Sequence, residues 1–223
     1  MKETPILFTP ENAQKSYEGL KTQTRRIITP QPISQHHIGW LSWGEFHPGF
    51  AVLTHYCNVV ERITCPYGTV GDRLYCKEVH YRWGKWERDG STKRGREKWR
   101  FHCDQTPAVF ELTSLQKLYR LTSKVAGKEG WQKRSPLFMP KAAARLWLEL
   151  TGVRVERVQE ITAGDCIREG IPEPRRSGEA LMMVDDGFDA IWAFRDLWTS
   201  INGPDAWERN DWVWVLDFKK VQP

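Results

Sequence analysis

The chain has 223 residues, enough to bury one substantial core, and we expect a single domain over residues 1–223 with an insertion at about residues 84–135. The formal net charge of +5 suits an anionic partner, and no apolar run is long enough to span a bilayer, so we expect a cytoplasmic protein that does not bind membranes. Five cysteines, odd in number and irregularly spaced, argue against the disulfide framework of a secreted protein. No histidine or cysteine pair has the spacing of a structural zinc site, and we expect neither a metal nor a cofactor.

The first predicted element is a helix that begins after Thr9. Thr9 can cap it, Pro10 suits the first helical position, and Gly19 stands where a C-terminal glycine belongs. From Lys21 onward the residues alternate as in a strand, which would place Lys21 and Thr24 on opposite faces. If both side chains serve one pocket, the backbone must bend between Gly19 and Thr24.

Residues 51–63 and 74–80 have the β-branched and aromatic content of strands. The next segment, Gly84–Arg100, carries seven positive and three negative residues, a net charge of +4, with tryptophans interleaved. This composition suits contact with phosphates and stacking on bases, and it equally fits a solvated hairpin or a disordered insertion. A short amphipathic helix is expected within residues 112–121.

In the last third of the chain, residues 145–150 and 153–158 alternate on either side of Thr151-Gly152, which predicts a β-hairpin. Thr162 and Asp165 form a capping-box pattern for a helix that ends at Glu169, directly before Gly170. A second helix is expected over residues 188–201, and residues 212–218 are apolar on nearly both faces, which predicts a central strand.

The stretch from Gly19 to Arg26 holds an unusual density of polar side chains. A lysine with a hydroxyl three residues later can anchor an oxyanion, or it can act as a base if its pKa is lowered by burial. Arg25 and Arg26 add planar forks that suit a phosphate or a base edge. The alternative is a solvated strand with an ordinary mixture of polar residues.

The pattern Gly19-x-Lys21-Thr22-x-Thr24-x-Arg26 resembles the signature of ASCH domains, a branch of the PUA-like superfamily associated with RNA and modified nucleosides. Residues 71–78, 165–171 and 212–218 agree with that family in the same order. Together with Cys65-Pro66-Tyr67-Gly68 and Met139-Pro140-Lys141, the pattern is similar to a prophage-associated subset. The resemblance implies an α+β fold, a PUA-like mixed β-barrel flanked by helices, with a basic insertion.

The resemblance also implies an enzymatic hypothesis. Some ASCH proteins are amidohydrolases that remove the acyl group from N(4)-acetylcytidine, and their catalytic lysine, threonine and glutamate match Lys21, Thr24 and Glu169. Thr24 would be the nucleophile, Lys21 would activate it or hold the oxyanion, and Glu169 would exchange protons. In a second version, water attacks and Glu169 is the base. A helix C terminus disfavours an anion, which suits Glu169 to acid–base work.

A further set of residues is expected to bind substrate or nucleic acid. Glu78 could project into the mouth of the barrel, although an ion pair with a neighbouring cation explains it equally well. The set comprises Arg25, Arg26, Glu78, Lys141, Arg145, Lys93, Arg94 and Arg96.

The other hypothesis is a non-catalytic RNA- or DNA-binding module of a phage or prophage, active in morphogenesis or regulation. The same cations and tryptophans would then be contacts only. In either case the expected partner is a nucleoside or a single-stranded nucleic acid, RNA rather than DNA, with no obligate protein partner.

Overall fold

The computed structural model describes residues 1–31, 40–42, 50–55, 58–172 and 186–222. The chain forms two compact units. The first comprises residues 1–4, 11–75 and 146–223, and the second comprises residues 5–10 and 76–145. The segment predicted as an insertion, residues 84–135, lies within the second unit.

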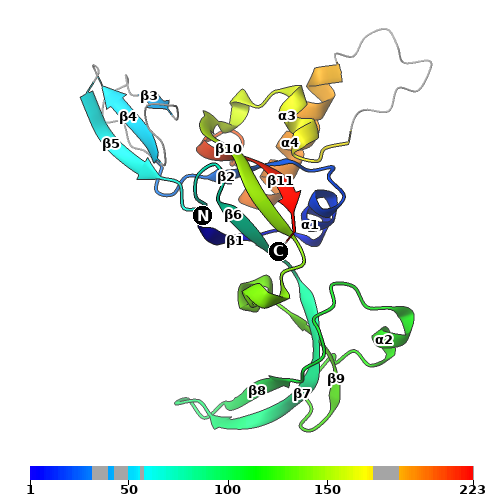
Figure 1. The fold of residues 1–223 in the computed structure, drawn as a ribbon. Helices are drawn as coiled ribbons and strands as arrows, with labels where there is room; N and C mark the ends of the chain where they lie inside the picture. Colours follow the sequence, from blue (N-terminus) through cyan, green and yellow to red (C-terminus); the bar gives the residue numbers. More distant parts are fainter. Residues whose placement is uncertain (32–39, 43–49, 56–57, 173–185, 223) are drawn as a thin grey trace, which may run out of the picture. The chain divides into compact units, whose positions relative to one another are not determined.

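The larger sheet has five strands in the order β1 (Glu3–Leu7), β6 (Arg73–Lys77), β10 (Trp147–Arg157), β11 (Trp212–Val221) and β2 (Gln23–Ile27). Figure 1 shows the two long strands β10 and β11 side by side. β11 pairs with β10 on one side and with β2 on the other, which confirms the prediction of a central strand.

The α+β class is confirmed, but the expected closed barrel is wrong for the part of the chain that the structure describes. β1 and β2 stay at the two edges of the five-stranded sheet. β3 (Trp40–Ser42), β4 (Phe50–His55) and β5 (Asn58–Thr64) pair with one another and form their own antiparallel sheet. These strands therefore do not extend the larger sheet toward closure.

The predicted hairpin at Thr151-Gly152 is also wrong, because residues 147–157 form one continuous strand. β10 pairs with β11 along its whole length, and the register shifts between Leu150 and Gly152. A Cβ atom at Gly152 would lie 2.7 Å from Asp217 Oδ2. Gly152 therefore marks a β-bulge at which Asp217 can approach the strand closely. Bulges and turns both favour glycine, which is why the sequence resembles that of a hairpin turn.

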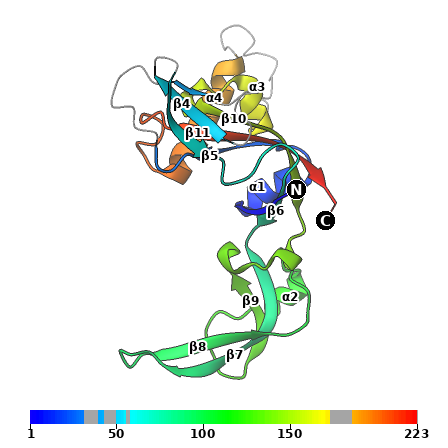
Figure 2. The same cartoon turned by 60° about the vertical axis from the view of Figure 1, so that its left-hand side comes forward.

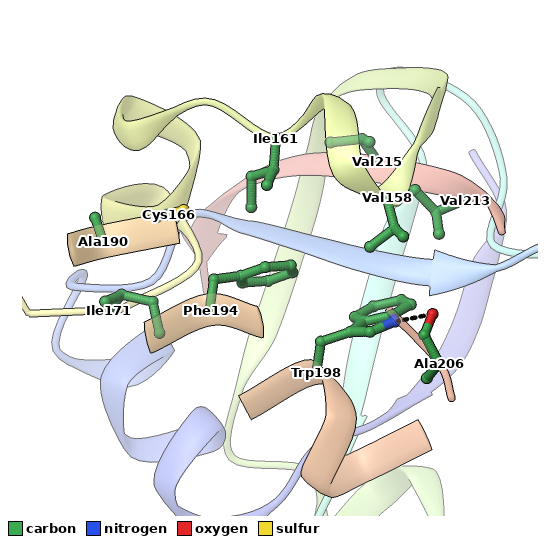
Figure 3. Close-up of a cluster of buried hydrophobic side chains, with 10 residues drawn as sticks. All are labelled: Val158, Ile161, Cys166, Ile171, Ala190, Phe194, Trp198, Ala206, Val213 and Val215. Atoms are coloured by element: carbon green, nitrogen blue, oxygen red, sulfur yellow. Dashed lines mark hydrogen bonds between the residues drawn. The ribbon is translucent and has the colours of Figure 1, made fainter. Parts of the chain in front are cut away.

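Three helices lie within two residues of their predicted limits: α1 (Pro10–Tyr17), α3 (Ala163–Arg168) and α4 (Asp186–Asn202). α3 and α4 pack together and cover β11 through an apolar cluster, shown in Figure 3. In that cluster the indole of Trp198 packs near Phe194, with ring centroids 5.8 Å apart, and Trp198 Nε1 donates a hydrogen bond to the Ala206 carbonyl oxygen at 3.3 Å. The fully buried valines of β11, Val213 and Val215, complete the contact. Burial of this apolar surface fixes α3, and hence its C-terminal residue, against the sheet.

The second unit contains a three-stranded antiparallel sheet in the order β8 (Glu97–Cys103), β7 (His80–Ser91) and β9 (Glu129–Arg134), visible in Figure 2. The predicted short helix is present as α2 (Ser114–Leu118). Two 3-10 turns, η1 (Pro136–Phe138) and η2 (Lys141–Ala143), precede β10, and a third, η3 (Val158–Glu160), follows it in the first unit. Within the described ranges, no helix is long and apolar enough to cross a membrane.

Candidate active site

Lys21 reaches the site from a bend between α1 and β2. Gly19 takes a φ of +80°, and the backbone amides of Leu20 and Lys21 donate to the Lys15 carbonyl oxygen at 2.8 and 3.2 Å. β2 begins only at Gln23, so Lys21 lies outside the regular alternation of the strand. The bend that a shared pocket requires is therefore present.

Glu169 reaches the site from the end of α3. The Thr162 hydroxyl and the Asp165 carboxylate form the predicted capping box at the start of this helix, and Glu169 is its C-cap residue. Gly170 follows with a φ of +86°, a conformation that favours glycine. The Thr22 amide donates to the Arg168 carbonyl oxygen at 2.8 Å, which ties the end of α3 to the start of β2.

The three residues predicted to be catalytic line one pocket along the edge strand β2. The hollow encloses about 560 Å³ of empty space, its open mouth included. α4 supplies an apolar wall through Phe194, Trp198 and neighbouring residues. The other lining residues are Asn12, Lys21, Thr24, Arg25, Arg26, Ile27, Glu169, Leu197, Ile201 and Asn202.

A buried ion pair joins the two ends of the site. Lys21 Nζ donates to Glu169 Oε2 at 2.5 Å and to the Glu169 carbonyl oxygen at 2.7 Å. Arg25 Nη1 donates to the other carboxylate oxygen, Glu169 Oε1, at 3.3 Å. Lys21, Thr24, Arg25 and Glu169 are each at most 5% exposed, so these charges act in a poorly solvated environment.

Burial sets the proton affinity of Lys21. Desolvation is the largest influence and lowers the pKa of the amine below its ordinary value, while the charge and hydrogen bond of Glu169 oppose the shift. The negative end of α3 alone would disfavour the Glu169 carboxylate, and an exposed glutamate is the other sequence-based expectation, which its burial contradicts. In the structure the Lys21 ammonium and the Arg25 guanidinium compensate that carboxylate directly.

Behind the pocket lies a polar network that sequence reasoning missed. Arg25 donates to Gln23 Oε1 at 2.6 Å, to Glu156 Oε2 at 2.9 Å and to Asp165 Oδ2 at 3.1 Å. Arg154 joins Glu156 to Asp217, and its Nη1 donates to Asp217 Oδ2 at 2.6 Å. With the pair at the pocket, the network sets four cations against four anions: Lys21, Arg25, Arg154 and Arg168 against Glu156, Asp165, Glu169 and Asp217.

Asp165 is the centre of this network as well as part of the capping box. Burial alone would raise the pKa of its carboxyl, but the Arg25 charge, together with hydrogen bonds from Arg168, Thr162 and Gln23, lowers it well below the ordinary value. The sequence signal was charge placed at alternate positions inside apolar strands, as at Arg154 and Glu156 in β10 and at Asp217 in β11. Such residues must find partners on a covered face.

The other predicted site residues have different surroundings. Arg26 lines the pocket, whereas Glu78 and Arg145 belong to the second unit and pair there, with Arg145 Nε 2.9 Å from Glu78 Oε1 and Nη2 3.0 Å from Oε2. This is the ion-pair alternative for Glu78. Lys141 lies in the exposed turn η2, and Lys93, Arg94 and Arg96 lie in the turn between β7 and β8. Across the residues described, no group of three or more His, Cys, Asp or Glu side chains is arranged to hold a metal ion.

Comparison of the chain with protein-family models, with curated proteins and with solved structures found no match.

Proposed function

We propose that this chain is an ASCH-type, PUA-like amidohydrolase that removes the acyl group from the N4 amine of an acylated cytidine. The observation that carries the proposal is that the buried side chains of Lys21, Thr24 and Glu169 line one pocket. Lys21 and Glu169, which form the ion pair, stand 148 residues apart in the sequence. The three groups are an amine, a hydroxyl and a carboxylate, a set that can supply a nucleophile, the base that activates it and a proton donor for the leaving group.

The Lys21–Glu169 pair supports the proton transfers. In the proposed first step Lys21 passes its proton to Glu169 across their 2.5 Å contact, which gives a neutral amine and a neutral acid. Burial, which lowers the pKa of Lys21, favours loss of that proton. The neutral amine then accepts the proton of the Thr24 hydroxyl as its oxygen attacks the acyl carbon. Lys21 is again an ammonium at that point, and it faces the developing oxyanion.

The remaining steps regenerate the enzyme. Collapse of the tetrahedral intermediate breaks the C–N bond, and Glu169 gives its proton to the leaving cytidine amine. The acyl group is then an ester on Thr24. Glu169, now a carboxylate, takes a proton from an incoming water, whose oxygen attacks the ester, and the released Thr24 alkoxide recovers a proton from the pair.

Release of cytidine from N(4)-acetylcytidine, followed by ultraviolet absorbance, tests the proposal. We expect turnover by the wild type and its loss in Lys21→Ala and in Glu169→Ala. Lys219→Ala and Glu149→Ala are the matched controls, because Lys219 and Glu149 form an ion pair of 2.8 Å in the same sheet but away from the pocket. An absence of turnover by the wild type on any acylated cytidine would favour the non-catalytic module, in which the pocket only binds the base.

A further inference from the structure

One face of the β7–β8 hairpin gathers aromatic rings. The strand register places Trp86 opposite Phe101 and Arg88 opposite Trp99. Because directly opposed residues of an antiparallel pair project to the same side, all four side chains share one face. The rings of Trp86 and Phe101 have centroids 5.1 Å apart, and all three rings are only half-buried. We call these three rings, Trp86, Trp99 and Phe101, the aromatic face.

A cation lies against each ring of the aromatic face. The guanidinium carbon of Arg88 lies 5.6 Å from the centroid of Trp99, and that of Arg134, on the neighbouring strand β9, lies 5.4 Å from Phe101. Lys124 Nζ lies 5.0 Å from Trp86. Each cation lies over its ring, so a base that stacks there takes the place of the cation, and the displaced cation stays within reach of the phosphate of that nucleotide.

The acidic residues of the hairpin are neutralised within it. On the opposite face Lys85 pairs with Glu87 at 3.0 Å, and Asp89 pairs with Lys98 at 3.3 Å and with Arg100 at 2.9 Å. The third acid, Glu97, pairs with Arg88 at 3.2 Å.

The turn of the hairpin adds positive charge without an acid. The Thr92 amide donates to the Arg96 carbonyl oxygen at 2.7 Å and closes a turn that exposes Lys93, Arg94 and Arg96. The sequence from Ser91 to Arg96 contains no acidic residue. The positive charge of the hairpin is therefore concentrated at its turn, next to the aromatic face.

We infer that the aromatic face and the turn of the β7–β8 hairpin bind single-stranded nucleic acid. Bases stack on Trp86, Trp99 and Phe101, and phosphates contact Lys124 and Arg134 beside the rings and the three cations of the turn. A duplex binds less tightly, because its bases are already stacked and cannot reach the rings. The inference is independent of the amidohydrolase proposal, since binding is measured without turnover and uses no residue of the pocket.

Fluorescence anisotropy of the full chain with labelled oligouridine, with oligothymidine of equal length and with duplex RNA, over a series of salt concentrations, tests this inference. We expect single strands to bind more tightly than the duplex. Replacing Lys93, Arg94 and Arg96 together by alanine should reduce the slope of log K against log salt by about 2, since each phosphate contact on a single strand contributes about 0.7. Replacing Lys85, Lys98 and Arg100 together by alanine removes the same formal charge from the opposite face. This variant should keep most of the slope of log K against log salt.

The stacking contribution is tested at Trp99. Trp99→Ala should weaken binding roughly 5- to 150-fold, and Trp99→Phe should keep most of the affinity. Trp192→Ala is the matched control, because Trp192 on α4 is 44% exposed and also has an arginine, Arg195, 4.7 Å from its ring. If Trp99→Ala does not fold, the alanine variant of Lys93, Arg94 and Arg96 still decides the test, because these three residues lie in an exposed turn. Equal binding of duplex and single strands, equal loss in both charge variants, or unchanged affinity in Trp99→Ala would each overturn the inference.

Discussion

Lys21 Nζ contacts both the carboxylate and the backbone carbonyl of Glu169, at 2.5 and 2.7 Å. The amine therefore holds the side chain of Glu169 and also occupies one of the carbonyl groups that the end of α3 leaves without a helical partner. The same contact fixes the start of β2 to the end of α3 and places two candidate catalytic groups in one pocket. Stability, and the chemistry proposed for the pocket, should therefore both depend on this pair.

Breaking this pair from one side should be costly. Lys21→Met leaves the Glu169 carboxylate buried with Arg25 as its remaining cation, and we expect a loss of about 3–5 kcal/mol in the free energy of unfolding. Glu169→Gln should cost a similar amount. The double variant should lose clearly less than the sum, because neither charge is then left alone. Urea denaturation measures all three, and additive losses would contradict a direct coupling between the two groups.

Asp165 should make the protein sensitive to acid. Its folded pKa lies below the ordinary value of 3.8, so its contribution to stability is present above that pH and is lost as the pH falls through the lowered folded pKa. Asp165→Asn should lower stability at neutral pH and should flatten this acid-side decline. Asp196→Asn, at an exposed position of α4, is the control. Denaturation midpoints measured from pH 6 down to about pH 2 decide the matter: an unchanged acid limb in Asp165→Asn would show that other carboxylates cause the decline.

Alanine substitutions at Gly170 and at Gly71 distinguish the effect of backbone strain from the effect of crowding at the pocket. Both have a positive φ, +86° and +88°. A Cβ at Gly170 would lie 3.1 Å from Lys15 Cδ and 3.2 Å from Lys21 Cβ, whereas at Gly71 it would meet nothing within 4 Å. Either alanine variant should lose about 1 kcal/mol or more through the unfavourable φ.

Only Gly170→Ala should also displace Lys21 and lower the rate of amide hydrolysis. Comparison of unfolding free energies with deacetylation rates for the two glycine variants separates the effects. Equal activity in the two variants would show that the chemistry tolerates movement of the lysine.

Thr24 tests the identity of the nucleophile. Thr24→Val keeps the shape of the side chain but removes its oxygen, and it should abolish any acyl-enzyme, while Thr24→Ser should retain one. Acid quenching during turnover followed by mass spectrometry of the peptide that contains Thr24 detects the ester. Full activity in Thr24→Val would assign the attack to water with Glu169 as base.

Features encoded in neighbouring residues could be predicted from the sequence. The capping box of α3 uses side chains three residues apart, and Gly19 begins the bend that follows α1. The prediction of a hairpin turn at Thr151-Gly152 is wrong because turns and bulges favour the same residues. The difference depends on Asp217, which lies on another strand and passes close to Gly152.

The charge network behind the pocket could not be predicted, because its members come from separate strands and one helix. Arg25 in β2, Glu156 in β10 and Asp165 in α3 meet only after the sheet has formed. The register that brings them together is set by long-range pairing, which local patterns do not determine. The candidate site could be predicted only because the resemblance links Lys21 and Thr24 with Glu169, since nothing local connects them.

The most direct test of the account is the rate of cytidine release from N(4)-acetylcytidine by the wild type and by Lys21→Met, a variant of similar side-chain length that lacks the amine. Urea denaturation of both proteins under assay conditions ensures that only folded protein is compared. The account predicts turnover by the wild type and a fall in kcat of about 10²- to 10⁴-fold in the variant. No turnover by the wild type, or an equal rate in folded Lys21→Met, would contradict it.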